Sequence, residues 1–234
     1  MTGFDWQWAF ALEVFPLLLS ACKFTILATG LGFLIALSLG LFLALLRAAR
    51  HPVIRWPVSF FIEFVRGTPV LVQIYFVYFV LPNFGIVLPA LLTGILVLGI
   101  HYSTYVSEVY RGGLANIDRG QWEAADALNM GTWRTYQRII IPQALPPIVP
   151  ALGNYLITLF KETPLLSAIA VTEMLQTAKD IGSETFRYTE PITIIGAIFL
   201  VLSLISAVAI RWVERDFRKR WGSSESLYSV GIKT

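Results

Sequence analysis

Long runs without charge dominate this sequence. From Gly67 to Ser107 the chain contains no Asp, Glu, Lys or Arg, and residues 191–210 also lack them. A helix needs about 20 apolar residues to cross the hydrocarbon core of a bilayer, because it rises about 1.5 Å per residue. Charged residues make up 14% of the chain, whereas soluble domains carry roughly 25%. The sequence therefore predicts an integral membrane protein.

Turn residues divide the uncharged runs into spans. The run from Gly67 to Ser107 is too long for one span, and Pro82-Asn83-Phe84-Gly85 provides a turn in its middle. We expect an all-α membrane protein of about five helices, in which Gly30, Gly32 and Gly40 let neighbouring helices approach closely. The expected spans are about 17–46, 57–81, 87–109, 147–170 and 191–211, in one membrane domain of residues 1–220 with a cytoplasmic loop at 111–142 and a tail at 221–234.

The distribution of basic residues predicts the orientation of these spans. With five spans, one side of the membrane receives fourteen of the eighteen Lys and Arg residues. The other side receives only Lys23, Lys161, Lys179 and Arg187. Because cytoplasmic loops carry the excess of Lys and Arg, we expect the N-terminus outside and the C-terminus in the cytoplasm.

The loop at 111–142 has the signals of a compact helical turn. Asp118 is placed to cap a helix, and Gln121 completes a capping-box pattern. Asn129 is placed to end that helix, because Asn tolerates left-handed backbone angles. Thr132 is predicted to cap a second short helix that Pro142 ends. Such a loop docks either into a groove of a partner protein or onto lipid headgroups, and both alternatives remain open from these signals alone.

The amino-acid sequence of this loop is more specific than these helix signals. Gln121–Gly131 reads Gln-Trp-Glu-Ala-Ala-Asp-Ala-Leu-Asn-Met-Gly and is followed by Ile139-Ile140-Ile141-Pro142. It resembles the loop of ATP-binding-cassette (ABC) importer permeases that docks on the ATPase subunit, with the pattern Glu-Ala-Ala, three residues, Gly, about nine residues, Ile-x-Leu-Pro. Asn129 replaces the Gly, and Ile141 replaces the Leu. The resemblance implies ATPase-coupling roles for Glu123, Ala124, Ala125, Leu128, Asn129, Met130 and Gly131.

The sequence as a whole is similar to permeases for ectoine-type compatible solutes, a branch of the polar amino-acid permease family, and four segments resemble that wider family. They are Arg66-Gly67-Thr68-Pro69 with Gln73, Gly153-Asn154-Tyr155, Lys161-Glu162-Thr163-Pro164 and Lys179-Asp180-Ile181. The resemblance implies a transport subunit of the bacterial inner membrane that is not an enzyme. Its partners would be a second permease subunit (identical or paralogous), two cytoplasmic ATPase subunits and an extracytoplasmic substrate-binding protein.

The sequence has no phosphate-binding loop of its own. The dipeptide Gly-Lys of the Gly-x-x-x-x-Gly-Lys-Ser/Thr motif does not occur. We therefore expect no cofactor in this chain, with ATP bound by a partner. A metal site is not expected from two histidines fifty residues apart. A nucleic-acid partner is not expected either, because no run of basic residues with interleaved aromatic residues occurs away from the ends of the expected spans.

Ionisable residues at membrane depth are functional candidates, because burying a charge in lipid is costly. If the fourth span begins near Pro150, Lys161 lies roughly 16 Å along it, and Pro164 breaks the helix there. If the span is 143–160 instead, Lys161 and Glu162 are solvated surface charges. Adjacent helical residues also point about 100° apart, so both face one ligand only where the helix breaks. The candidate pathway residues are Thr68, Gln73, Asn154, Lys161, Glu162 and Ser167.

Structural roles are predicted for two further charged residues. Arg66 is expected to pair with Glu63 at the cytoplasmic interface rather than contact substrate, and Glu108 to pair with Arg111. The alternative function is a secondary transporter or channel in which Lys161 and Glu162 relay ions. The absence of an inverted repeat argues against it. An intramembrane enzyme is disfavoured because no His-Glu-x-x-His or Gly-x-Ser-x-Gly motif occurs.

Overall fold

The computed structural model describes residues 6–221, which contain helices and turns and no strand. The expected tail therefore lies outside the described residues, apart from Trp221. The α-helices are α1 (Trp8–Arg47), α2 (Pro52–Arg66), α3 (Val70–Tyr75), α4 (Ala90–Ala115), α5 (Arg119–Ala127), α6 (Thr132–Thr135), α7 (Ile141–Glu162), α8 (Met174–Thr185) and α9 (Thr189–Trp221). Shorter segments are π-helical (η1, Phe76–Val80; η3, Tyr136–Ile140) or 3₁₀-helical (η2, Leu81–Phe84; η4, Thr163–Ile169).

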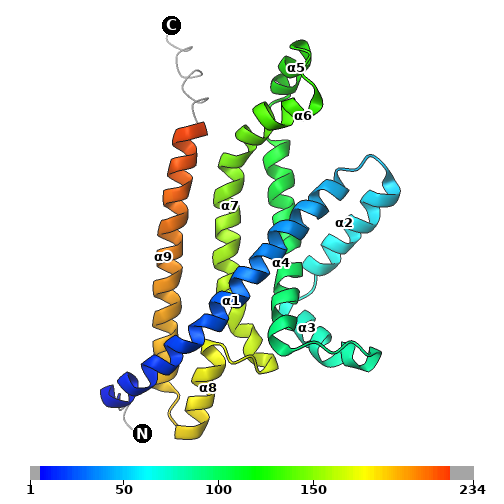
Figure 1. Cartoon of the computed structure of the whole chain (residues 1–234). Helices are drawn as coiled ribbons and strands as arrows, with labels where there is room; N and C mark the ends of the chain where they lie inside the picture. Colours follow the sequence, from blue (N-terminus) through cyan, green and yellow to red (C-terminus); the bar gives the residue numbers. More distant parts are fainter. Residues whose placement is uncertain (1–5, 222–234) are drawn as a thin grey trace.

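The long helices run between two ends of the molecule (Figure 1). The α5–α6 loop and the C-terminal end of α9 lie at one end, whereas α8 and the beginning of α1 lie at the other. In the described residues, four helices are long and apolar enough to cross a membrane, or five if the bent pair α2–α3 is one span. This agrees with the expected all-α fold of about five spans.

Helix α1 crosses α4 diagonally and makes its most extensive contact with it (Figure 1). Glycines allow this close approach. A Cβ atom on Gly40 would lie 2.7 Å from Val106 Cγ1, and one on Gly99 would lie 3.0 Å from the Gly32 carbonyl oxygen. Around Gly30 there is nothing within 4 Å. The expected packing role is thus confirmed for Gly32 and Gly40 and not for Gly30.

The expected span at 57–81 is not one straight helix. Helices α2 and α3 meet at 102°, with Gly67 at the C-terminal cap of α2 and Pro69 at the N-terminal cap of α3. Proline disfavours helical angles in the residue before it, which explains a break at Thr68. The helix then continues through η1 and η2 and ends at Gly85, whose φ of 80° is the left-handed conformation that glycine adopts readily.

Pro142 does not end a helix, contrary to the sequence-based prediction. The helical path runs from Thr132 to Ile169, with the π-turn η3 directly before the proline. In that turn the Ile141 N–H bonds to the Tyr136 carbonyl, five residues back. The wider turn accommodates a residue that lacks an N–H and would clash with the preceding turn of an α-helix. Gly131, rather than Thr132, caps this helix, and no side-chain cap forms there.

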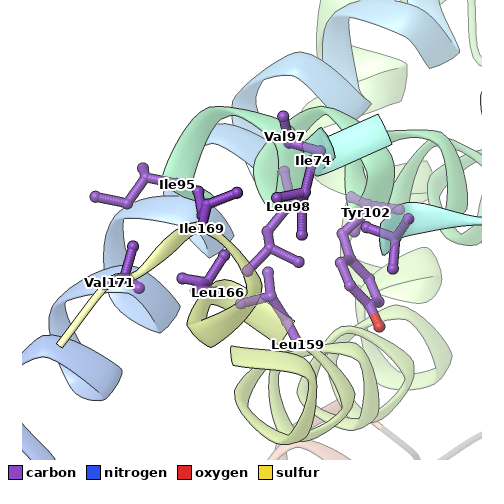
Figure 2. Close-up of a cluster of buried hydrophobic side chains, with 13 residues drawn as sticks. Ile74, Ile95, Val97, Leu98, Tyr102, Leu159, Leu166, Ile169 and Val171 are labelled. Carbon is purple, nitrogen blue, oxygen red and sulfur yellow. The ribbon is translucent and has the colours of Figure 1, made fainter. Parts of the chain in front are cut away.

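Two buried apolar clusters hold the bundle together. The larger joins α1, α3, α4, α7 and η4, and Figure 2 shows Leu98 of α4 between Leu159, Leu166 and Ile74. The smaller joins α1, α8 and α9 around Leu18, Met174 and Ile195. Many large apolar side chains remain on the outer surface, among them Leu34, Leu200 and Leu204. Such a surface is suited to lipid or to other membrane subunits.

Buried carboxylates fix α8 and the first turn of α9. Glu173 is fully buried and accepts the backbone N–H groups of Leu175 (2.9 Å) and Gln176 (2.8 Å) at the start of α8. Burial raises the pKa of the Glu173 carboxyl. Glu190 is also buried, pairs with Arg187 and accepts the Gln7 backbone N–H at 3.1 Å. The start of α1 is therefore attached to the α8–α9 connection.

Candidate coupling loop and membrane polar cluster

The α5–α6 loop begins as expected, with one difference. The Asp118 side chain caps α5 by accepting the Gly120 N–H at 2.7 Å. Gln121 does not close a capping box. Its side-chain oxygen accepts from Gln143 Nε2 at 3.0 Å instead. This hydrogen bond between Gln121 and Gln143 links α5 to α7.

The end of α5 has a specific local geometry. Asn129 is left-handed, with φ of 52°. Its N–H bonds to the Asp126 carbonyl at 2.9 Å, and the Met130 N–H bonds to the Ala125 carbonyl at 3.0 Å. These two bonds form a Schellman motif, which satisfies carbonyls at the end of the helix. The prediction that Asn129 ends the helix in a left-handed conformation is confirmed.

The outer side of this loop presents apolar and charged groups together. Leu128 is 74% exposed and Trp133 is 70% exposed, and the Glu123 side chain is also exposed. Ala125 is fully buried against the rest of the loop. Among the other expected coupling residues, Ala124, Asn129 and Gly131 are exposed and Met130 is half-buried. We call Glu123, Ala124, Leu128 and Trp133 the candidate docking surface.

An ion-paired group lies close to this loop in the chain. Glu108 of α4 pairs with Arg47 at the end of α1 and with Arg111 Nη2 at 2.7 Å. The expected pair with Arg111 is confirmed, and the contact with Arg47 adds a link between two helices. Arg111 lies within α4, which continues to Ala115.

At the α2–α3 break, Gln73 connects both helices with α4. Its Nε2 donates to the Val65 carbonyl (2.8 Å) and to Thr68 Oγ1 (2.7 Å), and its Oε1 lies 3.2 Å from His101 Nδ1. Gln73 and Thr68 also line a largely apolar cavity of about 310 Å³. Two of the candidate pathway residues are thus brought together, and His101 joins them.

Lys161 and Glu162 face different helices. Lys161 lines a pocket of about 220 Å³ with Phe199 and Ser203 of α9. The Glu162 carboxylate lies beside the Tyr102 hydroxyl of α4. Figure 2 shows that hydroxyl at the edge of the apolar cluster, pointing away from Val97 and Ile74. The helix continues to Glu162 before the 3₁₀ turn, so the two side chains do not converge on one ligand.

Three tyrosines surround this position. We call Tyr102, Tyr105 and Tyr155 the tyrosine cluster. Its ring centroids are 6.1 Å apart for Tyr102 and Tyr105, 5.6 Å for Tyr105 and Tyr155, and 6.3 Å for Tyr102 and Tyr155. Offset and edge contacts at such distances are favourable. The cluster joins α4 to α7.

The remaining candidates, Asn154 and Ser167, lie apart from these groups. Asn154 is exposed on α7, and its backbone carbonyl accepts from Thr158 at 2.9 Å. Ser167 is half-buried in η4, and its carbonyl accepts the Ala170 N–H at 3.1 Å. Neither side chain forms a hydrogen bond within residues 6–221.

Comparisons with known proteins decide the family. The family described as "binding-protein-dependent transport system inner membrane component" matches residues 36–219. The chain belongs to this permease family. A probable amino-acid ABC transporter permease of Sinorhizobium fredii is 45% identical, over 93% of this chain and 96% of that protein. Another, from Bacillus subtilis, is 31% identical over 93% and 98% of the two chains.

A solved structure agrees with the fold of the permease. A chain in the crystal structure of an amino acid ABC transporter with histidines has a TM-score of 0.86 and 37% identity. The match covers 91% of this permease and all of that chain. The expected fold class and the resemblance to ABC importer permeases are confirmed.

The position of Arg66 in the permease differs from the one predicted from the sequence. Arg66 forms no ion pair with Glu63. Its guanidinium stacks over the Tyr105 ring instead, 4.8 Å from the centroid. Arg66 also lies at the end of α2 rather than at its beginning, roughly 21 Å from Pro52 along the helix. No local signal indicates a contact between residues 39 positions apart.

Proposed function

We propose that this permease is the membrane subunit of an ATP-driven importer for an amino acid or a similar compact zwitterion, including ectoine-type solutes. It acts with two cytoplasmic ATPase subunits, a second permease subunit and an extracytoplasmic binding protein. ATP and any cofactor belong to the partners, and this chain itself catalyses no reaction. The names of the two relatives and of the solved transporter support the substrate class.

The candidate docking surface is the main observation that supports this proposal. The loop exposes a leucine, a tryptophan and a carboxylate around the Schellman motif that ends α5. Large apolar side chains in such a short helical loop are suited to a groove of a partner protein. The contact between Gln121 and Gln143 connects α5 to α7. ATP-driven movement of a docked ATPase would therefore reach the transmembrane helices through α5.

The excess of basic residues supports an orientation with this loop in the cytoplasm. The N-terminus and α8 then face the opposite side, where the binding protein delivers substrate. The C-terminal end of α9 is at the same end of the molecule as α5 (Figure 1). This arrangement agrees with the positive-inside rule.

The secondary-transporter alternative has less support. It requires Lys161 and Glu162 to act in one relay, whereas Lys161 faces α9 and Glu162 faces α4. The better candidates for residues that line the translocation path are Thr68, Gln73 and Glu162. Asn154, Lys161 and Ser167 have less support as path residues.

Co-purification tests the proposal. The permease is extracted in mild detergent from membranes of its own cells, and the proteins that accompany it are identified. We expect an ATPase with a phosphate-binding loop to accompany the wild type and to be lost in Glu123→Lys. Glu13→Lys is the matched control, because Glu13 is also exposed but lies in α1. Recovery of the permease alone, or equal ATPase recovery with Glu123→Lys, would contradict the proposal.

A further inference from the structure

The connection between α1 and α2 carries two arginines that no acidic residue compensates. Arg50 and Arg55 are exposed, and neither forms an ion pair within residues 6–221. The sequence contains no Asp or Glu over residues 14–62. The nearby Arg47 differs, because it is paired with Glu108. Arg50 and Arg55 are therefore available to an anion from outside the chain.

Helix α2 continues from these arginines with an exposed apolar face. The residues of this face are Val53, Trp56, Phe60 and Phe64, with exposed fractions between 60% and 73%. Their spacing of three, four and four residues places them on one side of the helix. The rings of Phe60 and Phe64 stack with their centroids 6.1 Å apart, whereas Ile62 on the other side of the helix is buried. We call these four residues the apolar face of α2. A patch of this kind is suited to contact with lipid or protein rather than water.

The arginines and the apolar face follow one another along the helix. The ion pair of Arg47 with Glu108 places the α1–α2 connection beside the end of α4 that leads to α5. Figure 1 shows this connection at the edge of the molecule, apart from α7 and α9. From Arg55 to Phe64 the helix rises roughly 14 Å, which is about half the thickness of the hydrocarbon core. A basic end is thus followed by an apolar face that reaches well into one leaflet.

An anionic phospholipid complements both parts of this surface in one molecule. Its phosphate matches the arginines, and its acyl chains match the apolar face. Trp56 is suited to the boundary between the two, where tryptophan is enriched in membrane proteins. A second copy of this chain matches less well. Among the described residues at its α5 end, the exposed carboxylates of Asp118, Glu123 and Asp126 lie in the α5–α6 loop and not beside an apolar face of a span.

We propose that the first turns of α2 bind an anionic phospholipid, with Arg50 and Arg55 at its phosphate and the apolar face of α2 along its acyl chains. In the proposed orientation, this lipid belongs to the cytoplasmic leaflet. The inference does not depend on the imported solute, because it requires only that the permease resides in a membrane. It assigns lipid selectivity to one helix of the permease.

The test identifies the lipid that contacts Trp56 in the complete complex, reconstituted into phosphatidylcholine vesicles. Lipids with brominated acyl chains quench the fluorescence of a tryptophan that they touch. The contribution of Trp56 is the difference between the wild type and Trp56→Phe. Brominated phosphatidylglycerol and brominated phosphatidylcholine with identical acyl chains are compared. Because one arginine near a membrane surface favours anionic lipid about fivefold, phosphatidylglycerol should reach half-maximal quenching at a mole fraction at least about fivefold lower.

The variants should assign this preference to the two arginines. The double variant Arg50→Gln/Arg55→Gln should lose the preference for phosphatidylglycerol and retain quenching by phosphatidylcholine, because its apolar face is intact. Arg134→Gln is the matched control and should keep the preference, since Arg134 is also exposed but lies in α6. Added salt screens exposed charges, so it should weaken the preference in the wild type and leave the double variant unchanged.

Other results would overturn the inference. Equal quenching by the two lipids in the wild type would show that the site does not select anionic lipid. No quenching by either lipid would show that protein, such as the second permease subunit, covers the apolar face of α2. An equal loss of preference in Arg134→Gln would show a general effect of charge. If the double variant does not assemble, Arg55→Gln alone should reduce the preference severalfold, and an unchanged preference contradicts the inference. None of these results depends on uptake, so the proposed function is tested separately.

Discussion

The carboxylate of Glu108 on α4 forms an ion pair with the guanidinium of Arg47 at the end of α1. Glu108 also holds Arg111 one turn further along α4. These side chains are partly buried, so water screens the ion pair with Arg47 less than it would screen a surface pair. The pair joins α1 and α4, the two most extensively packed helices.

Replacing Glu108 by Gln should lower stability, because two arginines would lose their shared carboxylate. The loss of a partly buried ion pair costs more stability than the loss of an exposed pair and less than the loss of a fully buried one. We therefore expect the free energy of unfolding to fall by about 1–2 kcal/mol. The measurement is the thermal unfolding midpoint in detergent. Glu13→Gln is the control, since Glu13 is exposed and forms no ion pair within residues 6–221. Equal midpoints for the two variants would contradict a stabilising role.

A methyl group at Gly40 should disturb the contact between α1 and α4. An added Cβ would lie 2.7 Å from Val106 Cγ1 and 2.9 Å from the Ser103 carbonyl oxygen, so a backbone shift is needed. Overpacking of this kind costs about 1–3 kcal/mol. Gly40→Ala should therefore unfold at a lower temperature than Gly30→Ala, because Gly30 has no neighbour within 4 Å. The reverse order would show that the helices are not in contact as described.

Asn129 should tolerate Gly but not Val. Its φ of 52° costs a residue with a Cβ about 1–2 kcal/mol, and Asn offsets part of this better than a β-branched residue. Asn129→Val should open the α5–α6 loop and speed tryptic cleavage after the exposed Arg134, whereas Asn129→Gly should not. Peptide mapping by mass spectrometry provides the readout. Equal cleavage rates in both variants would contradict the left-handed cap.

Glu173 should make stability depend on pH. Burial raises its pKa above the ordinary value of 4.5, so the folded state favours the protonated carboxyl. The resulting stabilisation is fully present below the unfolded pKa and is lost as the pH rises through the folded pKa. The unfolding midpoint should thus fall as the pH rises from about 4, and Glu173→Gln should remove this part of the dependence. A Glu173→Gln profile parallel to that of the wild type would show that another group is responsible.

Local signals predicted the geometry of the α5–α6 loop well. The Asp118 cap and the left-handed Asn129 depend on residues within one turn, and both are confirmed. Helix geometry left open whether Lys161 and Glu162 face one ligand, and the continuity of α7 to Glu162 decides that they point in different directions. Such features depend on short stretches of sequence.

Features that need a partner elsewhere in the chain were missed. Gln121 was expected to close a capping box, but Gln143 of α7 provides a competing donor. Pro142 was expected to stop a helix, but a π-turn absorbs it. Arg66 was assigned to Glu63 because a sequence shows only near neighbours, whereas Tyr105 approaches it from another helix.

The central claim is that ATP hydrolysis by a partner reaches this permease through α5. The most direct measurement is amino-acid uptake into proteoliposomes that contain the complete complex, with and without ATP inside. We predict uptake that requires ATP, is lost in Glu123→Lys and is retained in Glu13→Lys. Uptake that follows an ion gradient without ATP, or full ATP-driven uptake by Glu123→Lys, would contradict the account.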